Sequence, residues 1–134
     1  MRAANYLASD TGLLLVDPYN DFLSEGGKLW PPVQASATEQ NLIPNMKQVV
    51  VAVRAAGIRV FVVPHHRAEP SDLSHWHHAT PYQQGAAKIQ VFAKDSWGGE
   101  WHPDFVPQAD DVIAKEHWGS SGFANTDLDL LLRQ

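Results

Sequence analysis

Two short, largely apolar runs, residues 12–17 and 58–63, constrain the fold of this chain more than any other feature. The first ends in an acid, and each is followed at once by a proline. Continuous apolarity over so few residues is typical of strands buried on both faces, as in a parallel sheet. Between them, residues 41–56 place apolar side chains at three- and four-residue spacing and stop at Gly57, which predicts a helix. Strand, helix and strand predict a βαβ unit with a right-handed crossover, and so a three-layer αβα domain of the α/β class with a parallel, Rossmann-like sheet.

The rest of the chain predicts one further strand and one further helix. Residues 111–115 resemble a third strand, and Thr126 is expected to be the N-cap of a helix. That helix would end at Gln134 after barely two turns, without a glycine or proline to stop it. We therefore expect a single domain over residues 1–134 that is truncated, with a sheet incomplete at its C-terminal side.

Two stretches lack periodicity and are predicted as loops. The first follows the first strand to about residue 36 and is rich in glycine and proline. The second covers residues 65–107 and is rich in histidine, tryptophan, proline and glycine. Because so long a loop is unusual in a compact domain, we expect it to carry function.

Charge and composition exclude several classes of function. The formal net charge is −5 and the basic residues are scattered, which argues against a nucleic-acid partner. No apolar run approaches the roughly 20 residues of a membrane span, and the N-terminus lacks a signal-peptide core, so we expect a cytoplasmic protein without a membrane partner. The chain has no cysteine, which excludes disulfides, thiolate zinc sites and thiol catalysis by these residues.

An acid and an amine follow two of the predicted strands. Asp17 ends the first strand and Lys115 ends the third, and ligands of an open parallel sheet bind outside the carboxyl ends of its strands. There the carboxylate can take a proton while the ammonium stabilises developing negative charge. The alternative is an ordinary ion pair at the rim of the sheet, because such pairs are not confined to active sites.

Three segments together resemble a known family. Residues 14–22 form an apolar strand that runs into D-x-x-N-D-F, residues 57–63 resemble the second strand of that family, and residues 115–128 carry K…S-x-F…T-D-L. The chain is thereby identified as similar to the N-terminal two-thirds of isochorismatase-like cysteine hydrolases. The match covers nearly the whole chain, in order.

The resemblance implies hydrolysis of a small-molecule amide, or of a related carbonyl or vinyl-ether substrate, by a protein that is usually a homo-oligomer. In that family a cysteine attacks the substrate, an aspartate exchanges the proton and a lysine assists. The resemblance gives these last two roles to Asp17 and Lys115, a structural role to Asp21 and a pocket position to Phe22. The family cysteine follows a fourth strand, beyond the end of this sequence, and some members cleave vinyl ethers without it.

The histidines raise the question of a metal. His65 and His66 follow the second strand, and three more lie about ten residues later, although clustered histidine alone is a weak metal motif. The nicotinamidase branch binds its metal through an aspartate and a histidine after this strand, where this chain has His65 and Arg67. We therefore expect no metal and no other cofactor, and His65 as a substrate contact.

Tryptophans are concentrated in the predicted loops near the rim. They can line an aromatic pocket for a small planar or acyl substrate, or equally cover the core or a subunit interface. Trp118, three residues after Lys115, is the preferred pocket residue.

The sequence leaves two other functions open. One is a non-catalytic fragment or pseudoenzyme that acts through oligomerisation by pairing its open sheet edge with another chain. The other, weaker hypothesis is a metal-binding module built on the loop histidines.

Overall fold

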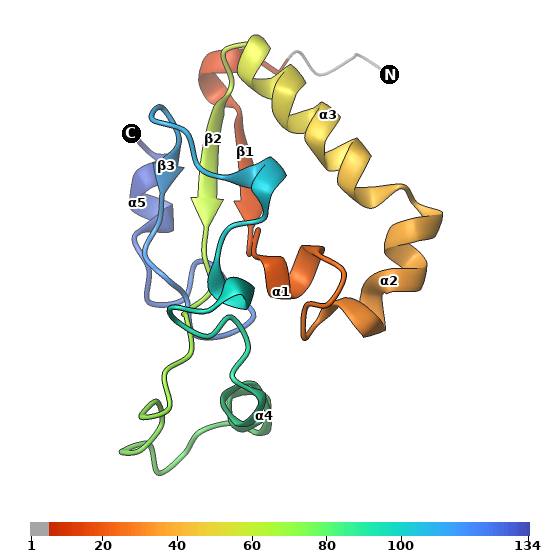
Figure 1. Cartoon of the computed structure of the whole chain (residues 1–134). Coiled ribbons are helices and arrows are strands. Elements are labelled where there is room, and N and C mark those ends of the chain that lie inside the picture. The colour runs from red at the N-terminus through yellow and green to blue at the C-terminus, as the bar shows by residue number, and fades with distance from the viewer. Residues whose placement is uncertain (1–5) are drawn as a thin grey trace, which may run out of the picture.

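The computed structural model describes residues 6–134, and its centre is a three-stranded parallel sheet (Figure 1). The strands are β1 (Gly12–Val16), β2 (Arg59–Val63) and β3 (Val112–Ile113), in the order β1-β2-β3. The α/β fold expected from the sequence is confirmed. The N-terminus, whose sequence lacks a signal-peptide core, lies mostly in residues 1–5, outside the described residues.

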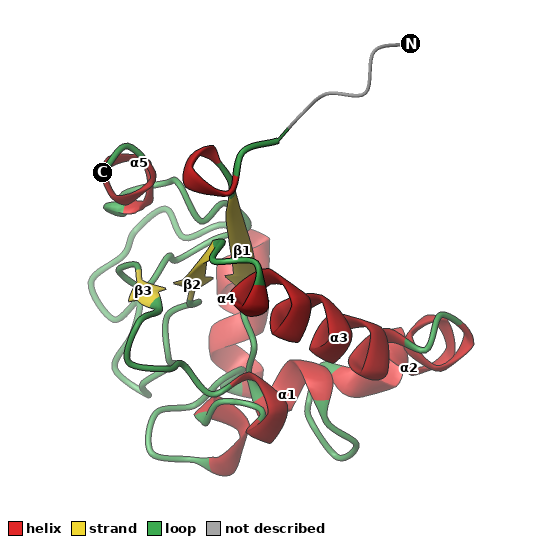
Figure 2. Ribbon diagram, turned by 90° about the horizontal axis from the view of Figure 1, so that it is seen from above, coloured by secondary structure: helices red, strands yellow, loops and turns green. Residues whose placement is uncertain are grey.

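Helices cover both faces of the sheet, as Figure 2 shows. Because successive side chains of a strand point to opposite faces, Val60 and Val62 face α3 (Leu42–Ala55), whereas Val63 faces the short helix α5 (Leu128–Leu132). The α3 side holds the larger core and the α5 side the smaller one. These are the three layers that the strand and helix pattern predicts.

The helix α3 begins and ends where local sequence requires. Pro44 lies in its first turn, where its missing N–H costs nothing. The chain leaves the helix through Gly57, whose φ of +71° is a left-handed conformation open to glycine. The predicted helix over 41–56 is therefore confirmed to within a residue at each end.

Both predicted loops contain helices, which corrects the prediction. The first contains α1 (Asn20–Leu23) and α2 (Trp30–Glu39). Two prolines in the first turn of α2 start the helix rather than break it. The second contains α4 (Pro81–Ile89), and two 3-10 turns, Trp97–Gly99 and Pro103–Phe105, follow it. Thr80 and Gln83 form a capping box at the start of α4.

The third strand is shorter than predicted and continues through a bulge. Val62 pairs with Ile113, and the ladder resumes where His65 pairs with His117. Between these two pairs the β2 side advances three residues and the β3 side four, so the latter contains one extra residue. In that bulge the N–H of Lys115 donates to Oδ1 of Asp127 at 2.8 Å. A bulge re-aims the side chains that follow it.

Within residues 6–134, β1 pairs with β2 only. Its other edge borders a groove of about 430 Å³ shared with α3, lined by apolar side chains that include Leu13, Leu15 and Met46. No helix in this part of the chain has the length and apolarity needed to cross a membrane.

Candidate active site

Asp17 stands directly after β1, at the carboxyl end of the sheet. Its backbone N–H donates to the carbonyl of Val63 at 3.1 Å, so the parallel ladder runs up to the carboxylate. Its φ of +50° lies in the left-handed region, where aspartate and asparagine are more frequent than other non-glycine residues. The side chain is 17% exposed. The sequence predicts this residue at the rim, and the structure places it there.

The hydrogen-bond partner of Asp17 is His117. His117 Nε2 lies 3.0 Å from Asp17 Oδ1, and His117 Nδ1 lies 2.6 Å from the carbonyl oxygen of Gly119. The imidazole is 2% exposed. Burial lowers the pKa of His117, but the hydrogen bond to Asp17 and the charge of that carboxylate outweigh burial and raise the pKa above its usual range.

Sequence reasoning missed His117. A regular continuation of the β2–β3 ladder would place Glu116 opposite His65. The bulge moves His117 into that position instead. No local signal announces the bulge, because its geometry depends on Asp127, which lies twelve residues from Lys115.

Lys115 is exposed in the structure. Within residues 6–134, no ion pair or hydrogen bond joins its ammonium to Asp17. The expected ion pair between Asp17 and Lys115 is therefore absent among these residues, and Asp17 pairs with His117 instead. The catalytic role of Lys115 stays a prediction.

His65 follows β2 and has one ring nitrogen without a partner. Its Nδ1 lies 2.8 Å from the carbonyl oxygen of His66, which can only accept, so Nδ1 carries the hydrogen. Nε2 is buried and has no hydrogen-bond partner among the described residues. Burial lowers the pKa of His65 and keeps the ring neutral, so Nε2 offers a lone pair. His65 also contacts the ring of His117 edge-on at 5.0 Å between centroids.

The next residue, His66, ties the rim loops together. Its Nε2 lies 2.8 Å from Asp72 Oδ2 and its Nδ1 lies 3.2 Å from Glu116 Oε2. Burial lowers the pKa of His66, but the hydrogen bonds to Glu116 and Asp72 raise it above its usual range overall. Its ring stacks on Trp118 with the centroids 3.6 Å apart, and Trp76 also stacks on Trp118, with the centroids 5.2 Å apart.

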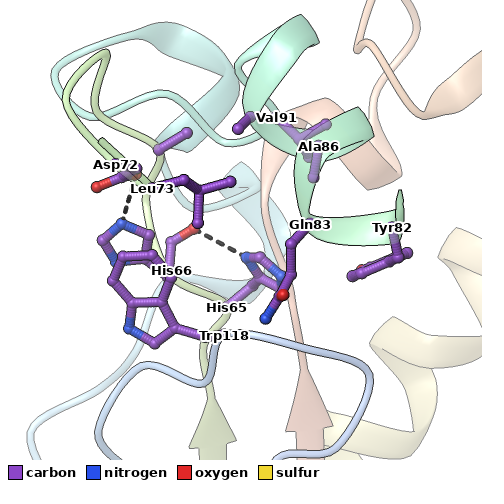
Figure 3. Close-up of a pocket in the computed structure, with 11 residues that line it drawn as sticks. His65, His66, Asp72, Leu73, Tyr82, Gln83, Ala86, Val91 and Trp118 are labelled. Carbon is purple, nitrogen blue, oxygen red and sulfur yellow. Dashed lines mark hydrogen bonds and ion pairs between the residues drawn. The ribbon is translucent and has the colours of Figure 1, made fainter. Parts of the chain in front are cut away.

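A small apolar pocket lies between these histidines and α4 (Figure 3). His65, His66 and Trp118 form one side, and Tyr82 and Val91 lie on the other. The structure thus brings together two of the three predicted substrate contacts, His65 and Trp118. Phe22, the third, lines a separate cavity of about 410 Å³ near α2. Contact of any of the three with substrate stays a prediction.

The D-x-x-N-D-F element holds the rim in shape. The carboxylate of Asp21 accepts hydrogen bonds from the backbone N–H groups of Lys28 and Phe92, and Asn20 donates to the carbonyl of Trp97. A Cβ on Gly98 would lie 2.5 Å from the carboxyl carbon of Asp21, so only glycine fits there. These bonds fix the loop after α4 against α1.

No group of three or more histidine, cysteine, aspartate or glutamate side chains is arranged to hold a metal ion within residues 6–134. His75, His77 and His78 are exposed.

Comparison with known proteins places these features in a family. The isochorismatase domain matches residues 11–134. Ureidoacrylate amidohydrolase RutB of Serratia proteamaculans is 32% identical over 143 residues, which cover 98% of this chain and 57% of that protein. The Yersinia enterocolitica protein of the same name is 36% identical over 137 residues, which cover 93% of this chain and 58% of that protein.

Two solved structures resemble the fold. A cysteine hydrolase from Pseudomonas syringae pv. phaseolicola superposes with a TM-score of 0.69 at 27% identity, over 98% of this chain and 60% of that one. N-carbamoylsarcosine amidase from Thermoplasma acidophilum gives a TM-score of 0.59 at 25% identity, over 91% and 60%. The chain spans less than three-fifths of the length of the two ureidoacrylate amidohydrolases, which are curated relatives. With the family domain matched from residue 11 to the last residue, the chain belongs to the isochorismatase family.

Proposed function

We propose that this chain carries the aspartate side of an amide-hydrolase active site, with Asp17 as the group that accepts and returns the proton. The observation that carries the proposal is the asymmetry of its carboxylate. Oδ1 is held by His117, whereas Oδ2 has no hydrogen-bond partner within residues 6–134 and the side chain stays partly exposed. An oriented carboxylate with one open oxygen is suited to general acid–base work.

The nucleophile in this proposal is a cysteine thiol from outside these 134 residues, since none lies within them. Asp17 takes the thiol proton as sulfur bonds to the substrate carbonyl carbon, and returns it to the nitrogen as the C–N bond breaks. Water then gives a proton to Asp17 as its oxygen attacks the thioester, and that proton restores the thiol. Each half-reaction leaves Asp17 as it began.

For the substrate we propose a small compound with a ureido or carbamoyl group. Two of the similar proteins bear names that contain these groups, ureidoacrylate amidohydrolase and N-carbamoylsarcosine amidase. Such groups carry N–H donors, and the buried lone pair on His65 Nε2 is an acceptor beside the pocket. Trp118 offers a flat surface for the planar group, and Phe22 belongs to the proposal as a more distant contact.

Lys115 enters the proposal through the family resemblance alone, as a cation at the same end of the sheet. A cytoplasmic location and assembly into a homo-oligomer belong to the same proposal, with neither nucleic acid nor membrane as a partner. Metal and cofactor play no part in the proposed steps.

The test uses a version of the protein that includes the nucleophile. Release of ammonia or amine is measured from a panel of ureido and carbamoyl compounds, with plain amides and vinyl ethers for comparison. The proposal expects turnover of a ureido or carbamoyl compound that Asp17→Asn abolishes. Full activity of the Asp17→Asn protein would overturn it.

A second candidate function rests on the bare edge of β1. The strand pairs on one side only within the described residues, and an apolar groove lies along its other side. An open edge of this kind can accept a strand from another chain. Light scattering of the isolated chain, with Leu13→Lys to disrupt the edge, separates an edge-paired oligomer from a monomer.

A further inference from the structure

We propose that His117, rather than Lys115, is the cationic partner of Asp17, and that it holds Asp17 in place as an imidazolium that shares one proton with the carboxylate. The inference rests on the proposed role of Asp17 and names the positioning residue of that site.

Both nitrogens of His117 face acceptors. Nδ1 lies 2.6 Å from the carbonyl oxygen of Gly119, which has no hydrogen to give, so Nδ1 carries one. Nε2 lies 3.0 Å from Asp17 Oδ1. A neutral ring with its hydrogen on Nδ1 would point a lone pair at a carboxylate oxygen, which is a repulsive contact. One more proton must therefore lie between Nε2 and Oδ1.

The proton belongs to the imidazole. Model imidazole binds a proton at a pKa of about 6.5 and a model aspartate at about 3.9, so the ring has the higher affinity. The other titratable ring against His117 is that of His65, which lies edge-on at 5.0 Å and is kept neutral by its burial. Beyond these, the carboxylate of Glu116 pairs with Arg67 at 3.2 Å and with His66 at 3.2 Å. The raised pKa of His117 agrees with this assignment.

The bulge explains why a histidine occupies the position expected for a lysine. The extra residue on the β3 side brings His117 level with His65 at the end of β2. Lys115 lies inside the bulge, where its backbone is bonded to Asp127 and its side chain is exposed. The histidine is 2% exposed, so its charge acts on Asp17 with little competition from water.

A histidine in place of a lysine as the cationic partner of Asp17 changes how the site responds to pH. A lysine stays charged to about pH 10, whereas an imidazolium loses its proton far closer to neutrality. Above that point the Nε2 lone pair faces the carboxylate and no longer holds it in place. The arrangement therefore makes the orientation of Asp17 dependent on pH, through His117.

The experiment is a nitrogen-15 NMR titration of the seven histidines in the 134-residue chain. At pH 7.5 both nitrogens of His117 are expected to show the chemical shifts of protonated imidazole nitrogens, because both face acceptors. Asp17→Asn is expected to lower the His117 midpoint by about one pH unit or more, since it removes the opposite charge. A His117 that is neutral at Nε2 at pH 7.5 in the wild-type chain overturns the proposal.

Three variants separate a positioning role from a merely structural one. Lys115→Ala is expected to leave the protonated shifts of His117 in place, and their loss in this variant alone would assign the pairing to lysine. In the version that includes the nucleophile, His117→Lys should restore most of the turnover that His117→Asn loses and should move the alkaline fall in kcat/KM to higher pH. An unchanged pH profile in His117→Lys contradicts the proposal.

The NMR readout needs no turnover, so it distinguishes the two proposals. If His117 is charged but no substrate is hydrolysed, the proposed function fails and the pairing stands. If Asp17→Asn abolishes turnover but His117 is neutral, the pairing fails and the role of Asp17 stands.

Discussion

Asp17 and His117 lie one hundred positions apart in the sequence, and a 3.0 Å hydrogen bond joins Oδ1 of the one to Nε2 of the other. The bond crosses from the end of β1 to the residue that follows the bulge after β3, past the end of β2. This hydrogen bond orients the carboxylate of Asp17 in the candidate site, and variants at its two residues test the proposed chemistry directly.

Asp17→Asn is expected to lower kcat/KM by roughly 10²- to 10⁴-fold, the usual contribution of general acid–base catalysis, in a version that includes the nucleophile. Folding should survive, because asparagine tolerates the left-handed backbone at this position as well as aspartate does. Steady-state kinetics with a circular dichroism melt measures both effects. Asp110→Asn, at an exposed position, is the matched control and should be silent.

The free energy of unfolding should depend on pH through His117. Because folding raises the pKa of this histidine, its contribution is fully present below the unfolded value of about 6.5 and is lost as pH rises through the folded value. The difference in stability between wild type and His117→Asn, expected at about 1–3 kcal/mol, should therefore be largest near pH 6 and shrink towards pH 9. Urea denaturation across this range measures it. His77→Asn, at an exposed position, is the matched control.

Gly98→Ala and Gly85→Ala should have opposite effects on stability. A methyl group on Gly98 would meet the carboxyl group of Asp21, and overpacking of this kind costs about 1–3 kcal/mol. Gly85 lies inside α4 with open space around it, so alanine there should stabilise by about 0.5–1 kcal/mol. Thermal melts of the two variants decide the matter. A neutral Gly98→Ala would mean that the loop after α4 can move away from α1.

His65→Ala should weaken substrate binding. An N–H donor of the substrate would lose its acceptor, which is worth about 1–2 kcal/mol, or roughly a tenfold rise in KM. The variant also removes the Nδ1–H that donates to the carbonyl oxygen of His66, so a thermal melt is measured beside KM. An unchanged KM in His65→Ala would remove this residue from the proposed substrate contacts.

Much of the fold follows from local pattern. The strands β1 and β2 and the helix α3 are each specified by periodicity and by a proline or glycine at their ends, and the prediction finds them within about a residue. The capping box at Thr80 and Gln83 is also a local signal, and it could have identified α4.

The site was less predictable, because its geometry is not local. Asp17 could be found since it ends a regular strand. His117 could not, since its position depends on one extra residue in the ladder and on the hydrogen bond that Asp127 makes to that bulge. The end of the predicted strand in the sequence identifies Lys115 as the partner of Asp17. In the folded ladder that partner is His117.

The unpaired edge of β1 has a consequence for hydrogen exchange. In the part of the chain that the structure describes, amide hydrogens on that side of the strand face a groove instead of the carbonyls of a neighbouring strand. Amide hydrogens on the β2 side form hydrogen bonds to that neighbouring strand, so they exchange only when the sheet opens. In deuterated water, β1 should thus show fast and slow amides in alternation, and the strand that leads to Asp17 would report, residue by residue, whether anything has docked beside it.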